Sequence, residues 1–108
     1  MKKTIFVTIL ILGIAVSSFV SAQGATNEEE TKGKAIFEKL NNQELKCENL
    51  SDEDFELVGE YFMGKMMGES HEAMNTMMEN MMGEKGEKDV HIAMGKRMSG
   101  CDPTATMP

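Results

Sequence analysis

The sequence predicts an all-α protein, a small bundle of three or four short helices closed by one disulfide bond. Three observations support this fold class: apolar residues recur at helical spacing, glycines separate the apolar segments, and no segment alternates long enough to form a strand. β-Branched and aromatic residues are scarce beyond the first 20 positions, which argues against a β-sandwich. The chain has 108 residues, enough for one small domain.

The N-terminus, residues 1–22, has the layout of a secretory signal peptide. Lys2 and Lys3 form a basic start, Ile5–Val16 is a short apolar run, and Ala22 stands at the expected cleavage position. The run is shorter than the about 20 residues that cross a membrane, so we expect no stable membrane span after cleavage. An uncleaved N-terminal anchor is the alternative. The sequence therefore predicts export to the periplasm or the extracellular space.

Charge and cysteine content narrow the class of protein further. Without the signal segment the chain has nine basic and 18 acidic residues, a net charge of −9. A protein that binds nucleic acid through its phosphates needs a basic face, so we expect no nucleic-acid partner. In an exported chain, Cys47 and Cys101 favour a disulfide bond, which stabilises a loop of this length by about 4 kcal/mol. A pair of thiolate metal ligands is the alternative.

The remainder of the chain is predicted to have three parts. Residues 23–31 are polar and acidic, with nothing to bury, which predicts a disordered leader. Residues 32–102 form the Met-rich helical domain, and residues 103–108 form a flexible tail.

Two helices are expected in the first half of this domain. Residues 32–45 contain apolar residues at helical spacing, and Asn41 and Asn42 predict that this helix ends near Leu40. Residues 51–67 carry the strongest helix pattern, with Ser51 as the N-cap and acids in the first turn. The apolar stripe of the second helix comprises Phe55, Val58, Phe62 and Met66, widened by Leu57, Tyr61 and Met63. Gly59 and Gly64 inside that helix would permit the close approach of another helix.

Two further helices are expected in the second half. The third begins near Ser70 and is ended by Gly83 and Gly86. The fourth begins near residues 87–89, where acids favour a helix N-terminus, and Gly100 is its expected C-cap.

The two histidines occupy repeated H-x-A-M elements that lie 20 residues apart. Each histidine is followed by methionines three and seven residues later, and positions three apart share a helix face. Imidazole and thioether together suit a soft ion, above all Cu(I). The candidate metal ligands are His71, Met74 and Met78 from one helix and His91, Met94 and Met98 from the other. The sequence therefore predicts an exported, non-catalytic protein that buffers or carries Cu(I) or Ag(I).

Two other interpretations of the methionines stay open. Methionine fills irregular gaps, so a Met stripe at helical spacing also suits a plain core. Alternatively, an adaptable Met-lined surface would bind a protein or peptide partner with no metal; its residues would be Met74, Met77, Met78, Met81 and Met82. The chain has no C-x-x-C, and the start of a zinc-protease motif at His71 lacks the second histidine because position 75 is Asn. We therefore expect no enzyme activity.

Overall fold

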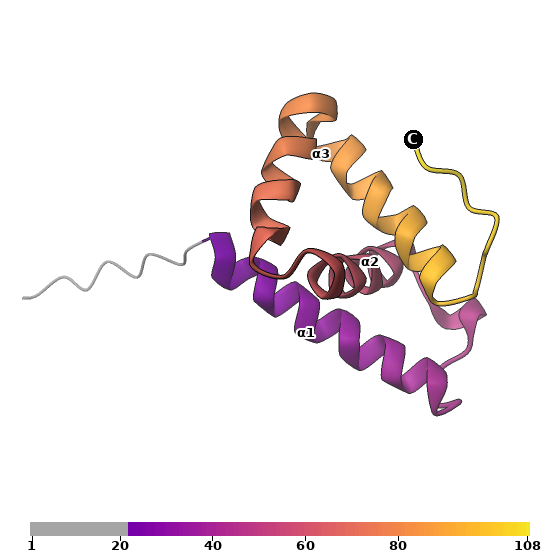
Figure 1. The fold of residues 1–108 in the computed structure, drawn as a ribbon. Coiled ribbons are helices and arrows are strands. Elements are labelled where there is room, and N and C mark those ends of the chain that lie inside the picture. The colour runs from indigo at the N-terminus through magenta and orange to yellow at the C-terminus, as the bar shows by residue number, and fades with distance from the viewer. Residues whose placement is uncertain (1–21) are drawn as a thin grey trace, which may run out of the picture.

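The computed structural model describes residues 22–108, which fold into three α-helices and two short 3-10 turns (Figure 1). The elements in chain order are α1 (Ala22–Asn41), η1 (Cys47–Asn49), α2 (Asp52–Met67), η2 (Gly68–Ser70) and α3 (His71–Met98). No strand occurs within this range, so the all-α fold class is confirmed. The predicted signal peptide lies outside the described residues except for Ala22, where α1 begins. None of the described helices is long and apolar enough to cross a membrane.

The segment predicted as a disordered leader, residues 23–31, belongs to α1 instead. An i,i+4 ion pair joins Glu28 Oε1 and Lys32 Nζ at 2.9 Å, and the following turn packs on α2. The polar composition of this segment matched disorder, but tertiary packing stabilises the helix. The helix ends at Asn41, next to the predicted end near Leu40, and Gln43 has a positive φ of 61° in the turn that follows.

The N-terminus of α2 has the predicted cap. Asp54 N–H donates to Ser51 Oγ at 3.2 Å, and Ser51 N–H donates to Asp54 Oδ2 at 3.0 Å, which completes a capping box. Four apolar side chains of the helix are buried: Phe55, Val58, Phe62 and Met63. Met66, expected in the apolar stripe, is instead 58% exposed in the last turn of α2.

The expected third and fourth helices are the two arms of α3, which are joined by a bend of non-helical backbone at Gly83, where the third helix was predicted to end (Figure 1). Gly83 has φ 78° and ψ 169°, a backbone conformation that is essentially restricted to glycine. The bend separates a first arm, residues 71–82, from a second arm, residues 84–98. Gly86, expected to help end a helix, lies inside the second arm.

Close contacts between helix backbones hold the second arm of α3 against α2. Gly59 lies against the backbone carbonyl of His91, and Gly95 lies against that of Phe55. A Cβ atom at either glycine would collide with the facing carbonyl, so two neighbouring helices approach closely only because both positions lack a side chain. The predicted role of Gly59 in close helix approach is therefore confirmed.

Aromatic packing and the disulfide bond complete the fold. The Phe37 ring of α1 lies 4.9 Å from the Phe62 ring of α2, centroid to centroid, in an edge-to-face arrangement. The predicted disulfide joins Cys47 in η1 to Cys101 just beyond α3. The segment expected to be a flexible tail returns to α3, where Arg97 Nε donates to the Ala105 carbonyl at 2.5 Å. Together these contacts place the two arms of α3 around the buried face of α2.

Candidate metal centre

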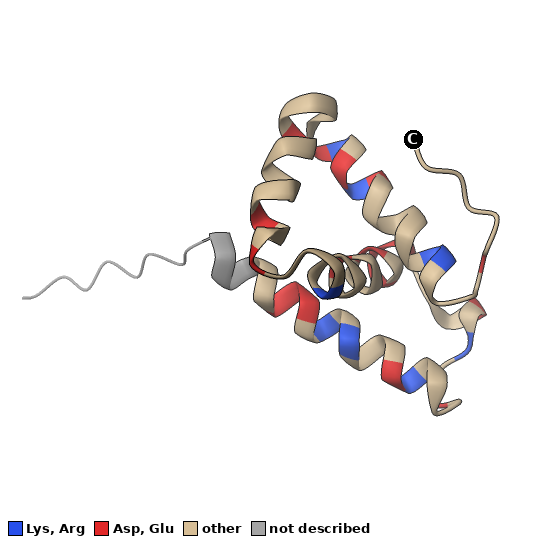
Figure 2. Cartoon of the chain, in the orientation of Figure 1, with Lys and Arg blue, Asp and Glu red and all other residues tan. Residues whose placement is uncertain are grey.

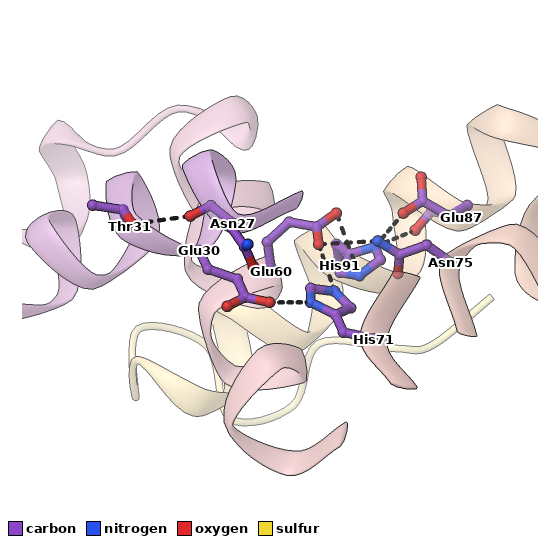
Figure 3. Close-up of polar contacts among 8 residues, drawn as sticks. All are labelled: Asn27, Glu30, Thr31, Glu60, His71, Asn75, Glu87 and His91. Atoms are coloured by element: carbon purple, nitrogen blue, oxygen red, sulfur yellow. Dashed lines mark hydrogen bonds and ion pairs between the residues drawn. The ribbon is translucent and has the colours of Figure 1, made fainter. Parts of the chain in front are cut away.

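Three buried side chains from α2 and both arms of α3 meet in the interior (Figure 3). They are Glu60 of α2, His71 at the start of α3 and His91 in the second arm, and they are 3%, 2% and 0% exposed. One potential ligand atom from each residue lies within 4.8 Å of the others. The bend at Gly83 makes this possible because it returns the chain, so that two histidines 20 positions apart reach the same carboxylate.

Both imidazole Nε2 atoms face the Glu60 carboxylate. The distance from His71 Nε2 to Glu60 Oε2 is 2.7 Å, and that from His91 Nε2 to Glu60 Oε1 is 3.5 Å. These separations are those of ion pairs, and the His71 contact is close enough for Glu60 to raise the pKa of His71, but neither Nε2 atom has a partner with full hydrogen-bond alignment among the described residues. Two buried ring nitrogens without aligned partners are unusual, because buried polar groups are nearly always hydrogen-bonded.

The opposite nitrogen of each ring is held by a further carboxylate. His71 Nδ1 lies 2.5 Å from Glu30 Oε1 of α1, and His91 Nδ1 lies 2.8 Å from Glu87 Oε1 (Figure 3). His91 Nδ1 is also 2.9 Å from the Glu87 backbone carbonyl. In metal sites a ligating histidine typically donates its other N–H to a carboxylate, which fixes the tautomer and points the free nitrogen at the ion. Both histidines have this arrangement here.

Glu60 is itself oriented by a neutral donor. Asn75 Nδ2, in the first arm of α3, donates to Glu60 Oε2 at 3.2 Å. The same oxygen faces His71, and the other oxygen faces His91, so both carboxylate oxygens are directed toward the imidazoles. The carboxylate is therefore fixed in a position from which either oxygen is available as a ligand.

The electrostatics of the cluster favour the charged forms of its three residues. Burial lowers the pKa of His71, but its contacts with Glu60 and Glu30 outweigh burial, and the net pKa is raised above 6.5. Burial likewise opposes the charged form of His91, yet Glu87 and Glu60 raise its net pKa above 6.5. Burial raises the pKa of Glu60, and the two histidines with Asn75 reverse this and lower it below 4.5.

More acidic groups surround this cluster. Burial is the main reason that the pKa of Glu29 is raised, and the charges of Glu60, Glu56 and Glu87 raise it further. Burial also raises the pKa of Glu56, which lies near Glu87 and Glu60. Figure 2 shows that acidic residues occur on all three helices. The centre of the fold thus has a strongly negative environment, which favours protons or a cation at the imidazoles.

The structure brings the two predicted histidines together and adds residues that the sequence did not indicate. Glu60, Glu30 and Glu87 were absent from the predicted site, although Glu60 stands inside an otherwise apolar run of α2 and Glu87 precedes His91 by four positions. An acid in an apolar helix segment is the signal that could have pointed to Glu60, since such a residue needs a buried partner.

The predicted methionine ligands are spread between core and surface. Met78 is buried, Met98 is 45% exposed, and Met74 and Met94 are half-buried. A helix rises about 10.5 Å over seven residues, which separates Met78 and Met98 along the helix from the histidines that precede them. The methionine part of the ligand set stays a prediction.

The arrangement is one that can hold a metal ion. Two imidazoles and one carboxylate supply three ligand atoms, and the side chains of all three residues are buried. Comparisons with models of protein families, with curated proteins and with solved structures found no match to this chain.

Proposed function

We propose that Glu60, His71 and His91 bind a divalent metal ion, and that the protein is a non-catalytic metal buffer or carrier. One observation carries this proposal: two buried Nε2 atoms face the same carboxylate without aligned hydrogen bonds, while a carboxylate holds each opposite Nδ1.

Zn²⁺ is the ion that these donors suit best. Two imidazole nitrogens and a carboxylate form an established zinc donor set, whereas thioether sulfur prefers Cu(I). The charges also match, because raised pKa values favour protons on His71 and His91, and one divalent cation carries the charge of two protons. Where both histidines are protonated, loading therefore leaves the net charge of the cluster unchanged.

Export of the protein is part of the same proposal. The predicted signal peptide and the Cys47–Cys101 disulfide both fit an oxidising compartment, where such a cross-link persists. In that setting a small protein with one metal site would buffer the ion or carry it to a partner.

Cu(I) or Ag(I) binding through His and Met remains an alternative proposal. The thioethers favour it, and several lie at the surface: Met66, Met77, Met81, Met82, Met98 and Met107 are 37–74% exposed. The same exposure favours a second alternative, a Met-lined surface that binds a protein or peptide partner without metal, since methionine adapts to varied apolar partners.

Competitive titration with chelators distinguishes these proposals. We expect one equivalent of Zn²⁺ to bind with sub-micromolar affinity, and His71→Ala/His91→Ala to weaken it by at least tenfold, about 1.4 kcal/mol. Met77→Leu/Met81→Leu is the matched control, and it should leave Zn²⁺ binding unchanged. Zn²⁺ affinity that is equal in the wild type and the histidine variant would contradict the proposed site.

Two methionine variants test the alternatives. Cu(I) binding tighter than Zn²⁺ binding, and lost in Met74→Leu/Met94→Leu, would favour the soft-metal proposal. Self-association or peptide binding that is indifferent to chelators and lost in Met77→Leu/Met81→Leu would favour the interaction surface.

A further inference from the structure

A pocket opens beside the buried metal-binding cluster, on the side of His71. Its lining includes three carboxylates, Glu30, Glu69 and Glu72, together with Gly64 and His71 itself. Glu69 is exposed and Glu72 is half-buried, whereas His71 is only 2% exposed. The pocket thus joins solvent to a buried ligand residue whose Nε2 atom has no aligned hydrogen-bond partner in residues 22–108.

The two histidines differ in where they lie on α3. His91 is fully buried in the second arm of α3, and its Nδ1 faces both the side chain and the backbone carbonyl of Glu87. His71 has the shorter carboxylate contacts, but it is the first residue of α3 and follows η2, whose three residues are exposed and whose Gly68 has φ 55°. Short, exposed segments open locally at lower free energy than packed helices. An opening of η2 would therefore move His71 before it moved His91.

Glu30 links the pocket to His71. Its carboxylate lies directly over Gly64, where a Cβ atom would collide with it, and its Oε1 atom reaches His71 Nδ1 at 2.5 Å. Its side chain is 27% exposed, so it touches solvent as well as the buried ring. Gly64 thus provides the space in which Glu30 holds His71 in its ligating position.

We propose that this pocket is the port through which divalent cations enter and leave the site, and that Glu30 acts as the latch on His71. This inference rests on the proposed metal-binding function. Glu69 and Glu72 raise the local cation concentration at the mouth, as a cleft lined by one sign of charge does. Release of His71 from Glu30 lets the ring turn toward the pocket, while Glu60 and His91 stay in place as the fixed ligands.

The port is tested by the rate of loading. Co²⁺, whose visible absorption reports coordination, is mixed in a stopped-flow instrument with metal-free wild type, Glu69→Gln/Glu72→Gln and Glu79→Gln/Glu84→Gln. The last variant removes the same charge from exposed positions outside the port. We expect the port variant to load several-fold more slowly at low salt, with the difference shrinking as salt screens the charges. Equal loading rates in the two double variants at low salt would contradict the proposal that cations enter through this pocket.

The latch is tested by the rate of release. Gly64→Ala places a methyl group where the Glu30 carboxylate lies, without changing any charge. We expect Zn²⁺ transfer to an excess of chelator to become several-fold faster. Gly86→Ala is the control, because its methyl group would meet only the flexible Met82 side chain among the nearest atoms. Circular dichroism is used to check that both variants are folded. Glu30→Gln removes the charge from the same contact and provides a second, independent variant.

These measurements separate the inference from the proposed function. If wild-type protein binds neither Zn²⁺ nor Co²⁺, the metal site itself is wrong. If it binds them, and neither Gly64→Ala nor Glu30→Gln accelerates release, the site stands and the latch is overturned.

Discussion

Glu60 is an acid in a buried helix face, and its environment explains why it tolerates that position. Its side chain is 4% exposed, yet His71, His91 and Asn75 all face its two oxygens. Burial of an unpaired carboxylate would be strongly unfavourable, so these three neighbours are needed to stabilise the negative charge of Glu60. Conversely, the imidazoles rely on Glu60 to orient their Nε2 atoms.

Glu60→Gln tests this dependence. The amide keeps the size of the side chain but loses the charge and one potential ligand oxygen, so Zn²⁺ affinity should fall by more than the about 10–100-fold expected for loss of an outer carboxylate. The pKa values of His71 and His91 should also fall, because Glu60 contributes to raising both. Chelator competition and NMR titration of the imidazoles measure these effects.

Glu56→Gln is the control for that substitution. Glu56 lies one helical turn earlier on α2 and faces the same acidic environment, but it is not among the three converging ligands. A similar affinity in Glu60→Gln and Glu56→Gln would show that Glu60 contributes only general negative charge.

At the residue scale, the sequence predicted the histidines but not their carboxylate partners. The repeated H-x-A-M elements pointed to His71 and His91 through local spacing. Glu30 contacts His71 although the two residues are 41 positions apart, and local spacing in a sequence cannot predict such a contact. The proposed metal differs from the predicted one for the same reason, since the spacing showed methionines and not the carboxylates.

The bend of α3 is the element that assembles the candidate site. Because Gly83 reverses the chain, His71 and His91 approach until their ring centroids are 6.0 Å apart. The sequence correctly placed a glycine interruption here, and it could not show that the two arms would meet over Glu60, since that depends on packing against α2.

Gly83→Ala should weaken folding and metal binding together. A side chain in this backbone conformation costs about 1–3 kcal/mol, and nothing within 4 Å of Gly83 would otherwise hinder a methyl group. We expect the free energy of unfolding, measured in urea, to fall by about the same amount. Unchanged stability and Zn²⁺ affinity would show that the bend does not depend on glycine.

The crossing of α2 with the second arm of α3 is tested by Gly95→Ala. The new methyl group would collide with the Phe55 carbonyl, so the free energy of unfolding should fall by about 1–3 kcal/mol. Gly86→Ala, in the same arm, would meet the Met82 side chain and no backbone carbonyl among the nearest atoms, and it would gain helix propensity, so its loss of stability should be smaller. Urea unfolding compares the two; equal effects of the two substitutions would argue against a tight crossing at Gly95.

α1 shows where local patterns fail at the level of elements. Residues 23–31 are polar, and they form a helix because α1 packs along α2 and places Glu30 beside His71. The capping box of α2, by contrast, depends on residues three positions apart, and the sequence predicted it. Elements fixed by local contacts were predictable, whereas elements fixed by tertiary contacts were not.

For the molecule as a whole, the buried cluster sets how stability depends on pH. The pKa of each histidine is raised in the folded state, so its contribution is fully present below the unfolded value of 6.5 and is lost as pH rises through the raised value. The pKa of Glu60 is lowered, so its contribution is present above 4.5 and is lost as pH falls through the lowered value. Metal-free protein should therefore be most stable between these limits.

Zn²⁺ should reverse the loss of stability that the metal-free protein shows as pH rises above neutral. While both imidazoles are protonated, binding releases two protons, so affinity should rise by about 100-fold per pH unit until the histidines are neutral. Unfolding measured at about pH 5.5 and about pH 8.5, with and without Zn²⁺, should show little stabilisation at the lower pH and a large one at the higher. Stabilisation that is independent of pH would exclude the histidines as ligands.

The most direct test of the central claim is zinc-edge X-ray absorption of the protein loaded with one equivalent of Zn²⁺. Binding by Glu60, His71 and His91 predicts a first shell of nitrogen and oxygen at about 2.0–2.1 Å, with the outer-ring scattering of imidazole and no sulfur at about 2.3 Å. A sulfur shell, or a shell without imidazole that is unchanged in His71→Ala/His91→Ala, would contradict the account.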